Sequence, residues 1–532
     1  MPTSPLDHDA GRRALDHADT VIDSAARSLR DRGGVDINQS LAYDLAHAAS
    51  ALAVARSALD YGDRGVTEAN LADAFASSTL SELGARVLGR ETLWGVGPDW
   101  FEPLRPFVQT YRAASFLAPL AEAVGERHLD SDLALLSSTF HRFAEREIRP
   151  HAEHVHRANA DVPESVIEGL RELGAFGLSI PEEYGGAASP EGPSEVAMVV
   201  ATEELSWGSL AIGGSLITRP EILTRALLRG GTADQRATWL PKIASGETLC
   251  AIAVTEPDCG SDVAALTTSA TRTDGGWLLN GAKTWCTFAA RANLLAVLAR
   301  TDPDRSLAHR GLSLFLVEKL PSDSSGFAMA KYDSESGRMG GRPIDTIGYR
   351  GLHSYALSFD QWFVSDDCLV GGEEGLGRGF YLQMAGFENG RLQTAARALG
   401  LMQAAYDAAV AYARQREVFG RALIDYELTR VKLALMACTI QCARQFTLDV
   451  ARQIERRDSS LRAAMAKAFT SRAAEWVTRE AMQIHGGMGY AEEFAVSRYF
   501  LDARVLSIFE GADETLCLKV LAPRLLENLE DA

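Results

Sequence analysis

The 532-residue chain is too long for a single hydrophobic core and should fold into about three or four domains. Hydrophobic residues make up 46% and charged residues 23% of the sequence, which is typical of a globular protein. The formal net charge of −18 argues against general binding to nucleic acid or to an anionic membrane, because both need a basic face.

The sequence also predicts a cytoplasmic protein without a membrane anchor. Its longest apolar stretches, such as residues 294–299, fall far short of the ~20 residues that span a bilayer. The N-terminus lacks a basic segment followed by an apolar one, so no signal peptide is expected. The seven cysteines form no C-x-x-C pair and no Cys/His group with zinc spacing, which favours a reducing compartment and predicts no metal site.

Helical periodicity dominates the first half of the chain. Residues 9–127 keep apolar residues at helical spacing and contain no recognisable chemistry, so we interpret them as a docking or dimerisation module. Residues 129–248 are again helical. Between residues 249 and 368, short β-branched and apolar segments alternate with turn residues, which predicts a compact antiparallel β domain. From about residue 378 onward the pattern is that of long helices in a bundle.

The β region begins with a segment that could hold an anion or the edge of a ring. In residues 253–262 an extended stretch enters a Pro/Gly turn that offers hydroxyls and backbone N–H groups. Residues 280–283 then predict a hairpin turn, because Asn-Gly is a strong turn signal. Trp285 and Thr287 follow two residues apart, on one face of a strand, where an indole can stack on a flat ring system. The same pair also fits a core tryptophan and a surface threonine.

Two motifs in the helical C-terminal region could complete a nucleotide site. Residues 414–420 place clustered arginines at a helix end, where guanidinium groups are favoured and can bind a pyrophosphate. Residues 483–490 contain glycines that allow a ligand to approach the backbone closely. The glycine-rich residues 375–379 do not predict a dinucleotide fold, because no strand–turn–helix unit surrounds them.

Glu510 is the strongest catalytic candidate. It is a lone carboxylate between Ile508-Phe509 and Gly511, at the end of a helical pattern. Apolar neighbours disfavour the charged form of a carboxylate, which suits a general base that takes up a proton near neutral pH. A surface glutamate at a helix end fits the same local sequence.

The order and spacing of four segments, residues 253–262, 280–287, 414–420 and 483–490, resemble the acyl-CoA dehydrogenase family over residues 130–532. The resemblance implies a mostly α fold with a helical domain (129–248), a β-barrel middle domain (249–368) and a C-terminal four-helix bundle (369–532), to which this chain adds an N-terminal helical extension (1–128). It also implies FAD bound at the subunit interface of a homo-oligomer, either dimer or tetramer. An acyl-CoA thioester is the implied substrate and an electron-transfer flavoprotein the implied acceptor.

The resemblance assigns roles residue by residue. Glu510 is the implied catalytic base. The other family base position falls on Gly390, so that alternative site is empty. FAD is expected to contact one group of residues in one subunit and a second group in its neighbour: Val254, Thr255, Gly260, Ser261, Trp285 and Thr287, and then Arg416, Phe419, Gln483, Gly486 and Gly487. The expected substrate contacts are Ser261, Arg219, Arg391 and Gly511.

The chain departs from the usual family pattern at three places: Ala512 and Leu501 replace the threonine and arginine that are common there, and the N-terminal extension is atypical. These features, together with residues 383–387 and 389–395, resemble the branch that oxidises (2S)-methylsuccinyl-CoA to mesaconyl-CoA in the ethylmalonyl-CoA pathway. The free carboxylate of such a substrate needs a cation in a dry pocket, and Arg219 is the expected anchor. A surface arginine before a helix-starting proline is the alternative for Arg219.

Four other functions remain open from the sequence. A dehydrogenase for short branched monocarboxylic thioesters, such as isobutyryl-CoA, is the nearest, and an acyl-CoA oxidase would differ by forming peroxide in air. A flavin-containing DNA-damage-response protein is disfavoured by the net charge and by the lack of a basic C-terminal stretch. A purely structural helical protein would be colourless even after FAD is added.

Overall fold

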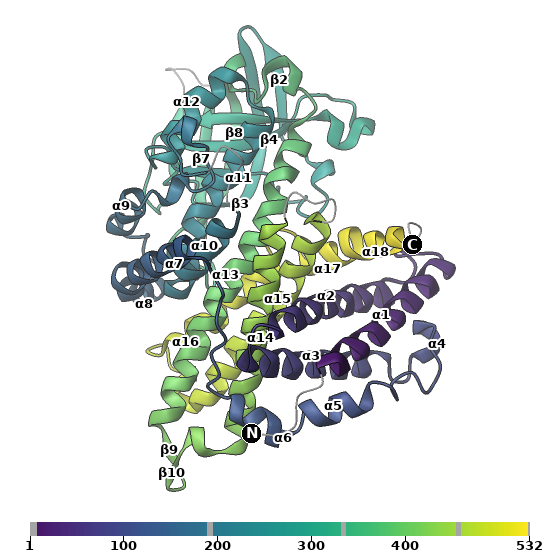
Figure 1. Cartoon of the computed structure of the whole chain (residues 1–532). Coiled ribbons are helices and arrows are strands. Elements are labelled where there is room, and N and C mark those ends of the chain that lie inside the picture. The colour runs from purple at the N-terminus through teal and green to yellow at the C-terminus, as the bar shows by residue number, and fades with distance from the viewer. Residues whose placement is uncertain (1–7, 189–194, 331–336, 454–458, 530–532) are drawn as a thin grey trace. The chain divides into compact units, whose positions relative to one another are not determined.

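The computed structural model describes residues 8–188, 195–330, 337–453 and 459–529. Within these ranges the chain divides into two compact units, one formed by residues up to 134 together with 394–532, and the other by residues 135–393 (Figure 1). The prediction of a mainly helical chain with a central β domain is confirmed. No helix in the described ranges is long and apolar enough to cross a bilayer.

The first unit combines the N-terminal helices with the C-terminal bundle. Helix α2 lies against α1, α3, α14 and α15, so apolar residues on most of its faces are buried, including Leu41, Leu45 and Leu52 (Figure 1). The N-terminal helices are α1 (His8–Asp31), α2 (Gln39–Gly62), α3 (Val66–Val87), α4 (Glu91–Trp94), α5 (Arg105–Tyr111) and α6 (Ala114–Leu117). The C-terminal helices are α14 (Glu427–Arg452), α15 (Ser459–His485), α16 (Ala495–Ala503), α17 (Asp513–Leu516) and α18 (Ala522–Asn528).

Helix α13 (Gly379–Gln415) is continuous and contributes residues to both units. A short hairpin of β9 (Glu417–Val418) and β10 (Arg421–Ala422) follows it.

The second unit joins helices to an eight-stranded sheet. Its helices are α7 (Ser131–Phe143), α8 (Arg149–Ala158), α9 (Glu164–Glu172), α10 (Glu195–Gly208), α11 (Ser215–Gly230) and α12 (Ala233–Ala244). Its strands are β1 (Cys250–Ala253), β2 (Ser269–Thr273), β3 (Gly276–Thr287), β4 (Leu294–Arg300), β5 (Leu312–Glu318), β6 (Phe327–Ala330), β7 (Arg338–Ile344) and β8 (Ser354–Ser365). Both faces of the sheet are apolar. One packs against α11 and α12, which explains why every residue of β4 is buried.

The strand order is β1-β4-β2-β3-β8-β7-β6, and β5 pairs with β4. Most neighbouring strands are antiparallel, as predicted, but β4 pairs in parallel with both β1 and β2. Among the described residues, the recorded pairings form an open path rather than returning from β6 to β1.

The predicted hairpin turn at residues 280–283 is wrong. These residues lie inside β3, where Gly281 has a φ of 140° at a shift in register against β8. The real turn between β2 and β3 is Asp274-Gly275, in which Gly275 has a φ of 71°. Both glycines have the positive φ that a hairpin turn prefers, but at residue 281 this conformation forms a β-bulge within the strand.

All seven cysteines are free thiols, and six of them are buried. Burial raises the pKa of each thiol, to about 12 for Cys286, Cys438 and Cys517. The same direction holds for the others, Cys250, Cys259, Cys368 and Cys442. Cys438 and Cys442, four residues apart on α14, both lie in the core.

Candidate active site

The two predicted ring-binding segments of the β domain are held together by a buried ion pair. Lys283, which is fully buried on β3, donates from Nζ to Glu256 Oε1 at 2.9 Å and to the Val254 carbonyl at 2.9 Å. The Thr284 N–H donates to the Thr255 carbonyl at 2.8 Å, so the turn after β1 is fixed to the end of β3.

The Glu256 carboxylate is ionised well into the acid range. Burial alone would raise its pKa, but Lys283 and hydrogen bonds from Thr268 and Thr267 bring it down to about 2. The two backbone N–H groups lie 2.7 and 2.8 Å from the carboxylate oxygens. Burial lowers the pKa of the Lys283 ammonium, an effect that Glu256 partly offsets. A charged, fully hydrogen-bonded pair therefore sets the shape of this edge of the domain.

The exposed side of this edge fits a flat, polar-edged ligand. Trp285 is 56% exposed with a φ of 58°, whereas its neighbour Cys286 is fully buried. Thr287 places Oγ1 3.3 Å from Ser354 Oγ. Ser261 is exposed in the turn held by Glu256. An open indole beside hydroxyl groups matches the requirements of an isoalloxazine ring, so these residues fit FAD.

Glu510 lies in the first unit, in the segment between α16 and α17. Its φ of 55° and that of Gly511, 98°, put both residues in the left-handed region, which is uncommon for a side chain larger than Asn. The Glu510 side chain is 12% exposed, and Oε2 is buried with no hydrogen-bond partner among the described residues. Such a carboxylate oxygen is available to a ligand's proton.

A buried arginine faces this carboxylate. Arg397 on α13 is fully buried, and its Nη2 lies 3.8 Å from Glu510 Oε1. Its guanidinium carbon lies 4.6 Å from the centre of the Phe509 ring, and Nη2 also donates to Thr394 Oγ1 at 2.8 Å. A fixed cation at this distance restricts where the carboxylate lies.

The backbone around Glu510 is anchored on both sides. Lys467, fully buried on α15, donates to the Gly511 carbonyl, and Ser471 on the same helix donates to the Leu506 carbonyl at 3.1 Å. The side chains of α15 thus hold a segment whose left-handed backbone would otherwise be unfavourable.

The remaining predicted FAD contacts lie at exposed positions of the first unit. Phe419 is 98% exposed at the β9–β10 turn, and Arg416 is exposed just before β9. Gln483, Gly486 and Gly487 are exposed at the end of α15, where an added Cβ on either glycine would meet nothing within 4 Å.

Arg219 is not a surface residue. It is 8% exposed inside α11, and Pro220 lies within that helix rather than at its start. Its Nη2 donates to the Tyr349 hydroxyl at 2.8 Å and its Nη1 to the Ser215 carbonyl at 2.5 Å. Arg391, the other arginine of the predicted substrate group, is partly buried on α13.

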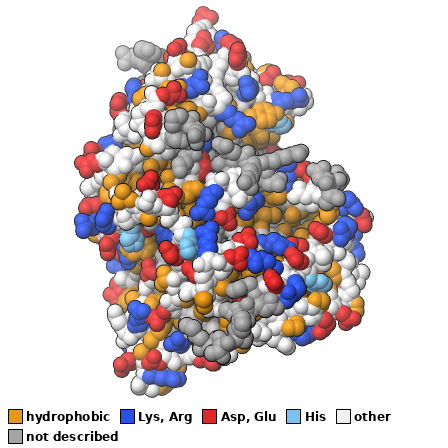
Figure 2. Space-filling model, in the orientation of Figure 1, with side chains coloured by type: hydrophobic (Ala, Val, Ile, Leu, Met, Phe, Trp, Pro, Cys, Tyr) orange, Lys and Arg blue, Asp and Glu red, His pale blue; other side chains and the backbone are white. Residues whose placement is uncertain are grey.

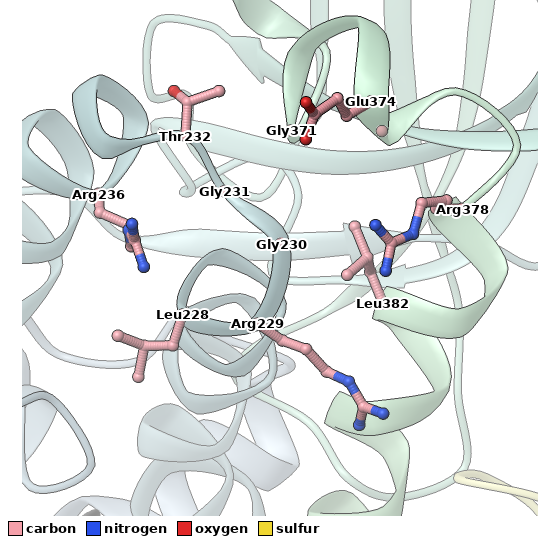
Figure 3. Close-up of a pocket in the computed structure, with 11 residues that line it drawn as sticks. Leu228, Arg229, Gly230, Gly231, Thr232, Arg236, Gly371, Glu374, Arg378 and Leu382 are labelled. Carbon is pink, nitrogen blue, oxygen red and sulfur yellow. The ribbon is translucent and has the colours of Figure 1, made fainter.

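The structure also contains a cavity of about 310 Å³ in the second unit, and none of its lining residues is a predicted site residue (Figure 3). Arg229, Arg236 and Arg378 line it together with Glu374 and the glycines of the loops that lead to α12 and α13 (Figure 3). Basic and acidic side chains are interspersed over the face of the molecule shown in Figure 2, as the mixed composition requires.

Comparisons with known proteins agree with this arrangement. The N-terminal, middle and C-terminal domain models of acyl-CoA dehydrogenase match residues 130–247, 251–362 and 377–525. The chain belongs to the acyl-CoA dehydrogenase family. It is an FAD-dependent oxidoreductase that acts on a CH–CH bond.

Three similar proteins illustrate the extent of the likeness. The (2S)-methylsuccinyl-CoA dehydrogenase of Cereibacter sphaeroides is 41% identical over 437 residues, which are 80% of this chain and 77% of that protein. The solved butyryl-CoA dehydrogenase of Megasphaera elsdenii is 29% identical with a TM-score of 0.68, over 75% of this chain and 99% of that one. A chain from a structural study of the electron-transferring flavoprotein of Acidaminococcus fermentans is 29% identical with a TM-score of 0.66, over 75% of this chain and 98% of that one.

Sequence reasoning missed three buried charged residues of these sites, Arg397, Lys467 and Lys283. Each is surrounded in the sequence by apolar or small residues at the local period, which is the pattern of a core-facing position. A cation at a core position needs a partner, and that was the available signal.

Proposed function

We propose that the chain oxidises a short branched acyl-CoA at its α,β carbons, and that the substrate is (2S)-methylsuccinyl-CoA, giving mesaconyl-CoA. The observation that carries the choice of substrate is the 41% identity to a methylsuccinyl-CoA dehydrogenase over most of both chains. The pathway of acetyl-CoA assimilation through ethylmalonyl-CoA follows from that substrate. The proposal keeps the four parts 1–128, 129–248, 249–368 and 369–532.

In this proposal Glu510 removes the α-proton of the thioester. Its Oε2, which has no protein partner among the described residues, is the atom that takes up the proton. The Glu510 N–H donates to the thioester carbonyl as it gains enolate character, where a fixed donor stabilises the developing charge. Arg397 holds the carboxylate in place. When bound, FAD supplies the acceptor for the hydride that leaves the β-carbon.

We propose that Trp285 and Thr287 orient the flavin ring and that Thr255 and Ser261 hold its polar edge. The exposed residues of the first unit serve a second subunit in this proposal. Phe419 and Tyr490 are 98% and 84% exposed, and large apolar side chains at such positions are typical of an interface that another chain covers. We therefore propose a homo-oligomer in which Arg416, Gln483, Gly486 and Gly487 contact the neighbour's FAD. An electron-transfer flavoprotein is the proposed acceptor.

Anaerobic mixing with a panel of CoA thioesters tests the substrate. Flavin absorbance is expected to bleach with methylsuccinyl-CoA faster than with isobutyryl- or butyryl-CoA. Faster bleaching with isobutyryl-CoA would replace the dicarboxylic assignment with the monocarboxylic one.

Arg219 is the proposed anchor for the free carboxylate, since it is a buried cation whose polar contacts include a tyrosine hydroxyl. Arg219→Ala is expected to raise KM for methylsuccinyl-CoA about 10-fold or more, because losing one charged hydrogen-bonding partner costs on the order of 2 kcal/mol. KM for butyryl-CoA should change much less. Arg229→Ala, an exposed arginine of the same helix, is the matched control. An equal rise for both thioesters would remove Arg219 from this role.

A further inference from the structure

The N-terminal extension contacts the segment that follows Glu510. Tyr43 and His47 lie four residues apart on α2 and so project from the same face of the helix. The Tyr43 hydroxyl donates to Asp513 Oδ2 at 2.5 Å, and His47 Nε2 lies 3.0 Å from the same oxygen. His47 and Asp513 are buried, at 5% and 7% exposure.

Asp513 is the first residue of α17 and stands three positions after Glu510. Only Gly511, with its φ of 98°, and Ala512 separate the two. Lys467 already holds the Gly511 carbonyl from α15. A displacement of Asp513 would therefore be transmitted to Glu510 through two residues, one of which is a glycine.

The charges of this group favour strong hydrogen bonds. Burial would raise the pKa of Asp513, but the bonds from His47 and Tyr43 outweigh it and hold that pKa below its usual value. Burial lowers the pKa of His47, despite the opposing effect of Asp513. The Tyr43 hydroxyl thus donates to an ionised carboxylate that also lies within hydrogen-bond distance of His47 Nε2. Hydrogen bonds to an ionised acceptor are about twice as strong as neutral ones.

We propose that Tyr43 and His47 are positioning residues for catalysis, which clamp Asp513 and thereby hold Glu510 in its left-handed conformation. The extension, which lies outside the matched family domains, would then contribute directly to the geometry of the base. This inference rests on the proposed role of Glu510.

A metal ion is the competing interpretation. Cys517 Sγ lies 3.4 Å from His47 Nε2, so His47, Asp513 and Cys517 bring three possible ligand atoms together. Structural zinc sites use four ligands, and among the described residues this group supplies three. The 3.0 Å between Nε2 and Oδ2 is a hydrogen-bond distance.

Tyr43→Phe and His47→Gln in the full-length FAD-loaded enzyme test the clamp. Each is expected to lower kcat for methylsuccinyl-CoA on the order of 10- to 100-fold with KM changed less than about 3-fold, since small misplacement of a reacting group costs up to about 100-fold. The deuterium isotope effect with α-deuterated substrate should rise, because proton removal becomes slower. Amide hydrogen exchange in residues 508–516 should also accelerate.

Lys519→Ala is the matched control. Lys519 makes an exposed 2.8 Å ion pair with Asp36, which also joins the extension to the C-terminal segment, and its loss should leave kcat and exchange unchanged. Tyr43→Phe removes only a hydroxyl and guards against a general folding defect.

Three results would overturn the clamp: wild-type kcat and exchange in both variants, a loss of kcat that matches the loss of bound flavin, or stoichiometric zinc in the dialysed protein. An active Glu510→Gln enzyme would instead overturn the proposed base. The exchange measurement decides the clamp even if no thioester in the panel is oxidised.

Discussion

Glu510→Gln is expected to lower kcat for acyl-CoA oxidation by at least about 10²- to 10⁴-fold, the usual contribution of a general base. The amide keeps the shape of the side chain but cannot accept the α-proton. Rapid anaerobic mixing, with bleaching of the flavin absorbance as the signal, measures the step directly. The variant should bind FAD and acyl-CoA normally, because neither the Lys467 contact to Gly511 nor the fold of the β domain depends on the carboxylate.

Glu514→Gln provides the comparison for this variant. Glu514 is an exposed carboxylate four residues further on, in α17, and its replacement should leave the bleaching rate unchanged. Bleaching of the Glu510→Gln enzyme at the native rate would show that another group takes the proton.

Glu256→Gln is expected to destabilise the protein by about 3–5 kcal/mol, because it leaves the Lys283 ammonium buried without its counter-charge. Lys283 is fully buried, and the Val254 carbonyl would remain as an acceptor for its ammonium group. Urea denaturation followed by tryptophan fluorescence measures the loss, with FAD content as a second readout, since the pair joins two of the proposed flavin-binding segments.

The double variant Glu256→Gln/Lys283→Met separates the charge from the packing. Replacing both partners removes the unpaired charge, so it should be less destabilised than Glu256→Gln alone. If the two variants are equally unstable, the pair does not act through its charges.

The same pair predicts how stability depends on pH. The Glu256 carboxyl has a folded pKa of about 2, below its ordinary value of 4.5. Its contribution is therefore fully present above about pH 4.5 and is lost as the pH falls toward 2. Denaturation midpoints across this window should fall less steeply in Glu256→Gln than in the native protein. If the midpoints of the variant and the native protein fall equally steeply with pH, the Glu256 carboxyl titrates in the same range in the folded and the unfolded protein.

Local periodicity was sufficient to predict the helical and β regions. The shared face of Trp285 and Thr287 stays a prediction, because β3 shifts register between Lys283 and Cys286 and Trp285 has a φ of 58°. The Asn280-Gly281 turn failed because a glycine with positive φ serves a bulge as well as a hairpin, and only the partner strand decides between them. The expected apolar setting of Glu510 was half right: Ile508 is 55% exposed, whereas Phe509 packs under Arg397.

Contacts between distant parts of the chain were beyond sequence reasoning. Arg397 lies more than a hundred residues from Glu510, and His47 is 466 residues from Asp513. Neither pairing leaves a local pattern in the sequence, because the sequence around each residue reflects only the local element to which it belongs. The partners meet only when the chain has folded. The conformations of Glu510 and Gly511 were equally hidden, because the left-handed backbone depends on anchors in α15.

The state of the cysteines bears on how this flavoprotein resists peroxide, which attacks thiolates far faster than protonated thiols. Here burial keeps the thiols protonated, and Cys368 is the one of the seven that is partly exposed. The enzyme should therefore keep its activity in dilute peroxide without a reductant.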